Sequence, residues 1–276
     1  MRVYFKQIPI PTVVAESLTE ANRLANINLK TKVAYQEQSL VENPNWKLCT
    51  VNPAGPRVDF DRCELALFNE LTDIYQFSYL LRVGIDFCAV QEGCLPLHAG
   101  AVITSEKAMF IFGGTKHGKS TVIHSLSQVQ DIQEAGDDHV ICRNGAIFGN
   151  QARRIRTQDG LRETVFEAAK PLCHFGEYSI TIVDLGASNN YSKFDKDRLI
   201  TDRTIHKVAT KYLTEPLKIK DHSMQISDLF GEDFVDKYLS NFAAFVNGAQ
   251  TVRIASGTLE FIVQSIIEGE PCSTIQ

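Results

Sequence analysis

The segment "KAMFIFGGTKHGKSTVIHSL", residues 107–126, most constrains what this chain can fold into. Its apolar run at 108–112 predicts a short buried strand, and the residues that follow the glycines predict a helix. A glycine-rich turn between a strand and a helix aims backbone N–H groups at phosphate oxygens, and the helix N-terminus adds its positive end. The turn matches G-x-x-x-x-G-K-[ST] at Gly113, Gly118, Lys119 and Ser120. The segment therefore predicts a phosphate-binding loop in an α/β domain.

The chemistry of such a loop assigns a role to each of its last residues. Lys119 is expected to reach the β- and γ-phosphates of a nucleotide, and the Ser120 hydroxyl is expected to bind Mg²⁺. Lys116 and His117 either touch phosphate or substrate or face solvent, and we favour solvent. ATP is the expected donor, with GTP and pyrophosphate as alternatives. The residues expected to bind the donor are Gly113, Gly114, Thr115, Lys116, His117, Gly118, Lys119, Ser120 and Thr121.

A phosphate loop also needs a carboxylate for Mg²⁺, and the sequence offers two candidates. Asp184 ends the apolar run "ITIVD", which has the usual shape of the second nucleotide-site motif of ATPases and GTPases. The other candidate is the pair Asp137–Asp138 in "GDDHV". Adjacent carboxylates repel unless a cation or a shared proton lies between them, so this doublet suits a general base beside a metal ligand. The alternative is a solvated turn.

Three motifs taken in order resemble one known family. "LHAGAV" leads into the strand expected in "AGAVIT". "FGGTKHGKST" follows the next expected strand, "AMFIF", and "GDDHV" comes shortly after the loop. Together they resemble the catalytic domain of HPr kinase/phosphorylase, and more closely the shorter HPr-kinase-related proteins of peptide-modification gene neighbourhoods. The resemblance covers residues 94–145. It implies an α/β (α+β) fold of the compact P-loop type shared with phosphoenolpyruvate carboxykinase.

The resemblance also implies roles at the matching positions. Asp138 corresponds to the general base that accepts the proton of an attacking serine hydroxyl. Asp137 would support the metal together with Ser120, or orient that base. His98 would assist the transfer electrostatically, or would only bond to the backbone as a core residue. With Lys119 these residues form the expected catalytic set, and Asp184 becomes a structural residue.

The chain departs from the family pattern in two places. The family's later Glu-Ile-Arg-Gly segment has no clean copy, and Arg162 and Glu163 in "LRETVFEAAK" are only a weak substitute. The large N-terminal regulatory domain of HPr kinase is replaced by something shorter. These departures place HPr as substrate, the phosphorylase reaction and hexameric assembly in doubt.

The remaining chain predicts a two-part organisation. Residues 1–62 are expected to form a small N-terminal α+β unit that serves substrate recognition, and residues 63–276 the catalytic domain. Apolar residues recur every three or four positions over 64–88, which predicts a helix. Further helices are expected at 15–26, 119–129, 202–213, 228–246 and 257–268. Strands are expected at "RVYFK", "AGAVIT", "AMFIF", "DHVIC", "SITIVD" and "TVRIA".

Charge and cysteine usage narrow the function classes. A net charge of -5 argues against a general nucleic-acid surface. Seven scattered cysteines without a CxxC pair favour reduced thiols and a cytoplasmic protein. The N-terminus lacks the apolar core of a signal peptide, and the apolar segment 64–90 carries charges that a membrane span would exclude. No membrane partner is expected, and a homo-oligomer is possible.

These observations favour an ATP- and Mg²⁺-dependent kinase of a hydroxyl, with a serine or threonine of a peptide or small protein as acceptor. A small-molecule hydroxyl is the second choice of acceptor. A nucleotide-binding regulatory or assembly protein is an alternative, and so is a switch or motor NTPase that would use Asp184. Two basic clusters are candidates for substrate binding: Arg153, Arg154, Arg156 and Arg162, and Lys193, Lys196, Arg198, Arg203 and Lys207.

Overall fold

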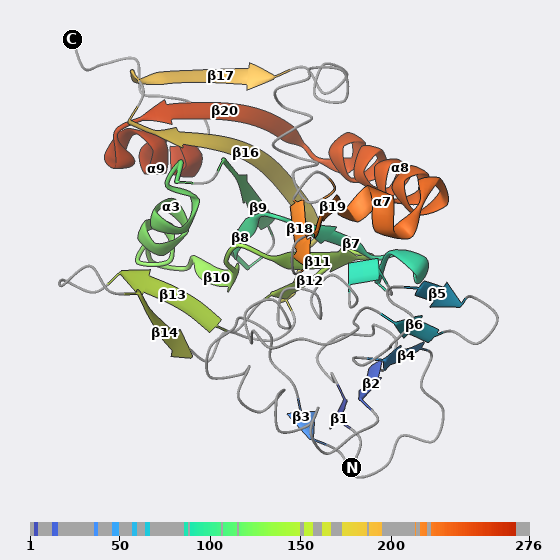
Figure 1. Ribbon diagram of the computed structural model, residues 1–276. Coiled ribbons are helices and arrows are strands. Elements are labelled where there is room, and N and C mark those ends of the chain that lie inside the picture. The colour runs from blue at the N-terminus through green and yellow to red at the C-terminus, as the bar shows by residue number, and fades with distance from the viewer. Residues whose placement is uncertain are drawn as a thin grey trace. The chain divides into compact units, whose positions relative to one another are not determined.

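The computed structural model has a mixed α/β architecture (Figure 1). The chain divides into two compact units, each built from separate segments. The first comprises 1–96, 150–168 and 213–239, and the second 97–149, 169–212 and 240–276. The structure describes residues 3–4, 13–15, 36–37, 46–49, 57–59, 64–66, 86–87, 89–105, 107–114, 116–149, 152–156, 162–166, 173–186, 188–194, 213, 216–219 and 222–268.

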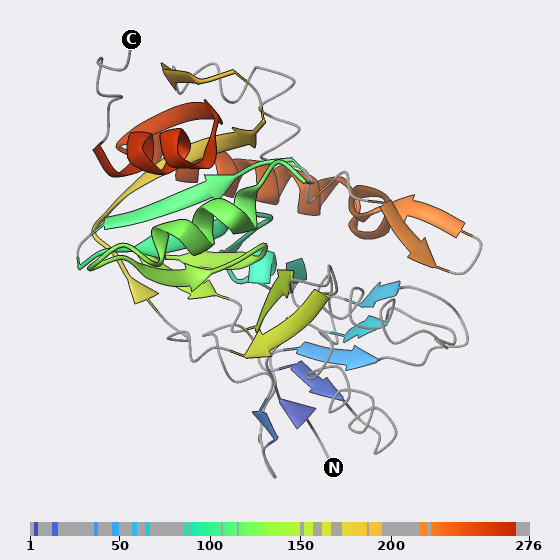
Figure 2. The same cartoon turned by 90° about the vertical axis from the view of Figure 1, so that its left-hand side faces the viewer.

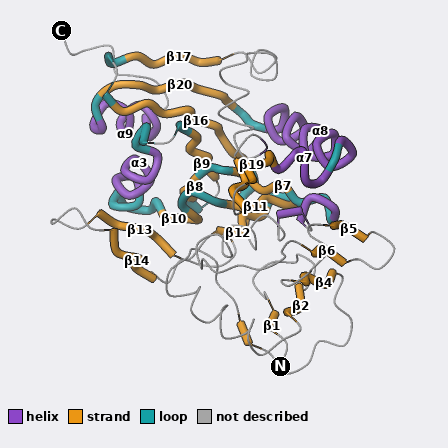
Figure 3. The backbone as a smooth tube through the Cα atoms, viewed as in Figure 1, coloured by secondary structure: helices purple, strands orange, loops and turns teal. Residues whose placement is uncertain are grey.

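The first unit contains a sheet of short strands in the order β3-β1-β2-β4-β6-β5. Figure 3 draws its strands as short orange segments, among them the labelled β1, β2, β4, β5 and β6. Its two central pairs, β2 with β4 and β4 with β6, are parallel, and the outer pairs are antiparallel. The bounds are β1 (Val3–Tyr4), β2 (Val13–Ala15), β3 (Gln36–Glu37), β4 (Trp46–Cys49), β5 (Arg57–Asp59) and β6 (Glu64–Ala66). The unit also contains two separate antiparallel strand pairs: β13 (Ala152–Arg156) with β14 (Arg162–Phe166), and β18 (Pro216–Ile219) with β19 (His222–Gln225).

An aromatic cluster fills the described core of this first unit. The Phe87 ring lies 4.3 Å from that of Phe230 and 5.5 Å from that of Phe234, measured between centroids. Phe230 ends α7 (Ile226–Phe230), and Phe234 and the fully buried Tyr238 lie in the first half of α8 (Glu232–Gly248). Such ring pairs contribute about 0.5–1.5 kcal/mol beyond their buried area.

The second unit is organised around a six-stranded sheet in the order β10-β8-β9-β16-β20-β17. Strands β9, β16 and β20 are parallel to one another, whereas β8 and β17 run in the opposite direction. β10 is antiparallel to β8, so it runs in the direction of β9. The bounds are β8 (Gly100–Ile103), β9 (Lys107–Phe112), β10 (Gln133–Gly136), β16 (Glu177–Leu185), β17 (Asn190–Phe194) and β20 (Thr251–Gly257).

This topology brings the conspicuous sequence motifs to one edge of the sheet. Strands β10, β9, β16 and β20 all end there, and β8 begins there. Because the carboxyl ends of parallel strands are the usual ligand-binding edge of an open α/β sheet, this edge is the place to look for a site.

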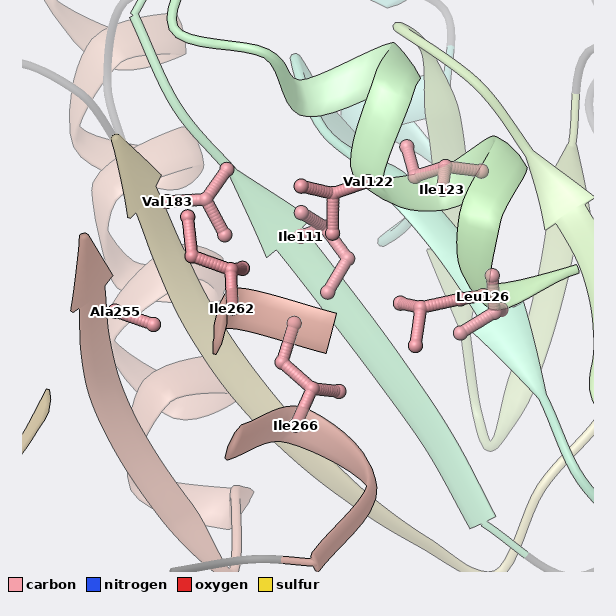
Figure 4. Packing of buried hydrophobic residues seen from close by; sticks show 9 residues of the cluster. Ile111, Val122, Ile123, Leu126, Val183, Ala255, Ile262 and Ile266 are labelled. Atoms are coloured by element: carbon pink, nitrogen blue, oxygen red, sulfur yellow. The ribbon is translucent and has the colours of Figure 1, made fainter. Parts of the chain in front are cut away.

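Two helices, α3 (Lys119–Leu126) and α9 (Leu259–Glu268), cover one face of this sheet, and Figure 2 shows both in front of the strands. Apolar side chains from both helices and from four of the strands meet in one buried cluster (Figure 4). Its members are Val102, Ile111, Val122, Ile123, Leu126, Val183, Ala255, Ile262 and Ile266. Gly100 permits the close approach of α3, because a Cβ there would overlap the Ile123 side chain.

The opposite face of the sheet carries aromatic residues. Neighbouring residues of a strand point to opposite faces, so Phe110 points away from the cluster that contains Ile111. Its ring meets that of Phe245, in the second half of α8, edge-on at 4.9 Å. Tyr178 stacks on Phe245 at 5.0 Å and donates a hydrogen bond to its carbonyl oxygen. A second sheet has the order β15-β12-β11-β7, with bounds β7 (Leu95–Leu97), β11 (Val140–Arg143), β12 (Ala146–Gly149) and β15 (Cys173–His174).

Most of the predicted elements around the loop are confirmed, with shifted ends. The hairpin β8–β9, helix α3, β11, β16, β20 and helix α9 all lie where the sequence predicts them, as does β1 within "RVYFK". The predicted helix 119–129 ends at Leu126, and the strand in "DHVIC" begins only at Val140. Asp138 has φ 67, which an extended strand does not accommodate.

Other helix predictions need correction. The helix predicted over 64–88 is wrong at Glu64–Ala66, which is strand β6, because the backbone there pairs with β4 and β5. Ala15, predicted as the start of a helix, ends β2. The helix predicted at 228–246 is two helices, interrupted at Gly231 with φ 80. Residues 16–26, 67–85 and 202–212 lie outside the described part, and the predicted boundary after residue 62 stays a prediction.

Among the described helices, none combines the length and the apolar character that crossing a bilayer requires.

Truncation of Ile123 tests the packing of α3 on the sheet. Ile123 is fully buried in the cluster, so Ile123→Ala should lower the free energy of unfolding by about 2–5 kcal/mol. Ile267 on α9 is 46% exposed, and Ile267→Ala serves as the matched control with little change. Urea unfolding of both variants measures the difference, and equal losses would contradict the assigned core.

Tyr178 provides a test of the aromatic face by pH. Burial, with a smaller contribution from Cys142, raises the pKa of Tyr178 from 10.0 to about 12. The folded state therefore keeps a proton that the unfolded state loses, so this contribution to stability is complete below pH 10 and is lost as the pH rises toward 12. Tyr178→Phe should flatten this decline in urea midpoints measured against pH. An unchanged slope in the variant would assign the decline to other groups.

Candidate phosphate-binding and catalytic site

The glycine-rich turn connects β9 to α3 at the ligand-binding edge of the sheet. Gly118 is the N-cap of α3, and its carbonyl oxygen accepts the first helical hydrogen bond from Val122 at 2.9 Å. No described side chain caps this helix end, and its first turn carries no acidic residue. The N–H groups of the first turn are thus left for an anion, which the helix dipole also favours.

Gly118 is required by both its conformation and its surroundings. Its φ of 85 lies in the left-handed region, which is unfavourable for residues with a Cβ. A Cβ at this position would also overlap the side chain of Leu185, the last residue of β16. The turn is held against β16 by a backbone hydrogen bond from Leu185 N–H to the His117 carbonyl oxygen, at 3.1 Å.

The carboxylate doublet lies directly after β10, where the strand is irregular. The register between β10 and β8 shifts between Glu134 and Gly136, and Asp138 adopts a left-handed φ of 67. Bulges of this kind re-aim side chains and are frequent beside active sites. The turn gives the two aspartates different surroundings: Asp137 is 1% exposed, whereas the Asp138 side chain is 32% exposed.

Each carboxylate of the doublet contacts a different residue of the phosphate loop. Asp137 Oδ1 accepts a hydrogen bond from Ser120 Oγ at 3.0 Å. Asp138 Oδ1 lies 2.7 Å from Lys119 Nζ, a charge-assisted hydrogen bond. The expected repulsion between adjacent carboxylates is thus relieved by Lys119. The ammonium group is nearly buried, and a charge in that position needs such a partner.

His98 completes this group from the connection between β7 and β8. Its Nε2 lies 3.6 Å from Asp138 Oδ1, on the same oxygen that Lys119 contacts. The three motifs singled out in the sequence therefore meet around Asp138. This arrangement joins a phosphate-binding cation, an accessible carboxylate and an imidazole, which are the groups needed to move a proton beside a bound phosphate.

Asp184, the competing carboxylate, is engaged elsewhere. Its Oδ1 lies 2.9 Å from His117 Nδ1, and both side chains are about half exposed. Within the described residues it makes no bond to Ser120, which donates to Asp137 instead. The pairing of His117 with Asp184 is absent from the sequence-based prediction. The sequence carries no local signal for this pair, because it depends on the parallel register of β9 and β16, which aligns Phe112 with Ile182 and leaves the following residues side by side.

The other predicted residues are distributed as follows. Lys116, with φ 68, and Thr121 are exposed, and Thr115 lies outside the described residues. Arg162 and Glu163 begin β14, which belongs to the first compact unit and not to the unit of the loop. Of the second basic cluster only Lys193, on β17, is described, and it is exposed. Arg153, Arg154 and Arg156 lie on β13.

The residues around Ser120 fit a magnesium ion of the kind that a nucleotide carries. The described part of the chain contains no group of three His, Cys, Asp or Glu residues arranged around a metal. Mg²⁺ in nucleotide sites does not need one, because it takes one or two protein oxygens and completes its shell with phosphates and water. The Ser120 hydroxyl and Asp137 carboxylate, 3.0 Å apart, provide such oxygens.

Comparison with known proteins adds no relative. The sequence matches no protein-family model, and no curated protein is significantly similar to it.

A matched pair of glycine substitutions tests the packing of the loop on β16. Gly118 and Gly93 have similar positive φ angles, 85 and 77, so alanine should cost each of them about 1 kcal/mol in backbone strain. Only at Gly118 would the new Cβ overlap Leu185, whereas nothing lies within 4 Å at Gly93. Gly118→Ala should therefore destabilise the protein more in urea unfolding. Equal losses of stability in the two variants would show that the Leu185 side chain moves aside without destabilising the protein.

Proposed function

We propose that this protein is an ATP- and Mg²⁺-dependent kinase that transfers the γ-phosphoryl group to a hydroxyl, with a P-loop domain of the HPr kinase/phosphoenolpyruvate carboxykinase type. The observation that carries the proposal is the contact of the doublet with the phosphate loop, Asp138 with Lys119 and Asp137 with Ser120. A generic NTPase site has no need for a second, partly exposed carboxylate on the phosphate-binding lysine.

Donor binding exchanges the partners of Lys119. The ammonium group now contacts Asp138 at 2.7 Å, and the β- and γ-phosphates of ATP compete with that carboxylate for it. As Lys119 turns to the phosphates, Asp138, whose side chain is 32% exposed, remains beside them. The bound donor thereby prepares the base.

The chemical step follows from this placement. Asp138 accepts the proton of an acceptor hydroxyl, whose oxygen forms a bond to the γ-phosphorus. The bond between that phosphorus and the β–γ bridging oxygen breaks, and ADP leaves with the electron pair. Lys119 and the N–H groups of the loop stabilise the charge that spreads over the phosphoryl oxygens. His98, 3.6 Å from the base, positions it or stabilises its charge.

Ser120 and Asp137 would hold the magnesium ion, since their oxygens are adjacent and Asp137 is buried. The ion would supply charge neutralisation on the β- and γ-phosphate oxygens. The difference in burial between the two aspartates then gives them different roles. Asp137 faces inward to the serine, and Asp138 faces the solvent from which an acceptor arrives.

A serine or threonine of a peptide or small protein is the acceptor that we favour, with a small-molecule hydroxyl as the second choice. The resemblance of the three motifs to HPr-kinase-related proteins supports this acceptor, as does the accessible position of Asp138. The scattered cysteines without a CxxC pair, of which Cys94, Cys142 and Cys173 are buried, support a cytoplasmic protein.

A nucleotide-binding regulatory protein with little kinase activity is the second candidate. The observation in its favour is the set of internal contacts itself, because Lys119 and Ser120 are satisfied without a ligand. Transfer of phosphate to an acceptor separates the two candidates.

Asp138→Asn is the decisive substitution. Loss of the base should lower phosphoryl transfer by about 10²–10⁴-fold. ATP should bind at least as tightly as before, because the phosphates no longer compete with a carboxylate for Lys119. The measurements are transfer of label from γ-labelled ATP to candidate peptides in the presence of Mg²⁺, and equilibrium binding of ATP.

Asp131→Asn is the matched control, since Asp131 is exposed and has the same φ of 67 as Asp138. It should change neither transfer nor binding. ATP binding without transfer to any acceptor would favour the regulatory protein. Hydrolysis that survives Asp138→Asn but is abolished by Asp184→Asn would reject the kinase in favour of a switch or motor NTPase.

A further inference from the structure

The pair His117–Asp184 has no role in the proposed transfer, yet it is built into the phosphate loop. His117 Nδ1 lies 2.9 Å from Asp184 Oδ1. The Leu185 N–H bonds to the His117 carbonyl oxygen at 3.1 Å, so backbone and side chain of His117 are both fixed to the end of β16. The imidazole also packs on Gly114, where a Cβ would come within 2.9 Å of its Nε2. The ring is therefore held in one orientation.

Held in this way, the pair presents hydrogen-bond acceptors to solvent. In a neutral ring the Nδ1–H donates to Asp184, which leaves Nε2 as an acceptor. Among the described residues neither Nε2 nor the second oxygen of Asp184 has a hydrogen-bond partner, and the two side chains are 47% and 48% exposed. A ligand can reach both.

The position of the pair relates it to the donor. The sheet order puts β8, which His98 precedes, and β10, which the doublet follows, on one side of the loop strand β9, and β16 on the other. The phosphoryl group to be transferred must lie beside Asp138, on the first side. His117 and Asp184 lie on the other side, at the ends of β16 and β20, so a part of the donor that reaches them is not the phosphoryl group that is transferred.

The chemistry of the pair selects what it binds. A carboxylate repels phosphate, and an acceptor nitrogen beside it needs a donor group. Adjacent hydroxyls provide two such donors, and in a nucleotide these are the ribose hydroxyls, which acidic residues also bind in other nucleotide sites. We propose that His117 and Asp184 bind the ribose hydroxyls of the donor, which makes the donor a ribonucleoside triphosphate and not pyrophosphate or polyphosphate. This inference rests on the proposed function.

Equilibrium binding in the presence of Mg²⁺ tests the inference with three probes: ATP, 2′,3′-dideoxy-ATP and tripolyphosphate. The wild-type protein should bind ATP about tenfold more tightly than the dideoxy analogue, the effect of a hydrogen bond to a charged group. His117→Ala and Asp184→Asn should each weaken ATP binding by about the same factor. Both variants should leave the affinities for tripolyphosphate and the dideoxy analogue unchanged.

Retained binding of tripolyphosphate by the variants shows that the loop is intact. His174→Ala and Asp131→Asn, two exposed positions away from the loop, are matched controls that should bind all probes as the wild type does. Equal wild-type affinity for ATP and the dideoxy analogue would overturn the ribose site and leave the kinase proposal standing. The same holds if the variants lose tripolyphosphate as much as ATP. Failure of the wild type to bind any probe would overturn the proposed function itself.

Discussion

The ion pair between Lys119 and Asp138 is the contact on which the site depends. It joins the first residue of α3 to the turn after β10. Lys119 is nearly buried, so removal of the Asp138 carboxylate would leave an unpaired positive charge in the interior. The hydrogen bond between the neighbouring residues Ser120 and Asp137 is a second contact between the same two segments.

The sheet makes this contact possible by bringing strand ends together. β8 starts where β9 and β10 end, which places His98, the loop and the doublet along one short edge. The neighbouring β16 ends at the same edge and contributes Asp184 and Leu185, one to the side chain and one to the backbone of His117. The phosphate loop is therefore supported on both sides, by charged residues in one direction and by packing and a His–Asp pair in the other.

The sequence predicts the parts of this site that depend on local pattern. The strand, the turn and the helix around Gly118 could be predicted because glycine spacing and apolar runs report them directly. The left-handed turn at Asp138 and the bulge before it could not, because they depend on pairing with β8. The bond between His117 and Asp184 could not be predicted from the sequence either, because it requires the register of β9 against β16. The apolar period at 64–88 predicts a helix that would include Glu64–Ala66. These residues form a strand instead, because sheet pairing overrides the helical pattern there.

The hairpin β8–β9 has a consequence for how the site assembles. Lys107 and Thr104 close it with short-range hydrogen bonds, and α3 and β10 follow without a long excursion of the chain. His98, the phosphate loop and the doublet thus come from one continuous stretch of the chain, in which Lys119 and Asp138 are 19 residues apart and Ser120 and Asp137 are 17 residues apart. Closing short loops costs little entropy, and local contacts form early. The half of the site around Asp138 is in this sense built from a single segment of the chain, and the half around His117 and Asp184 is completed only when the more distant β16 joins the sheet.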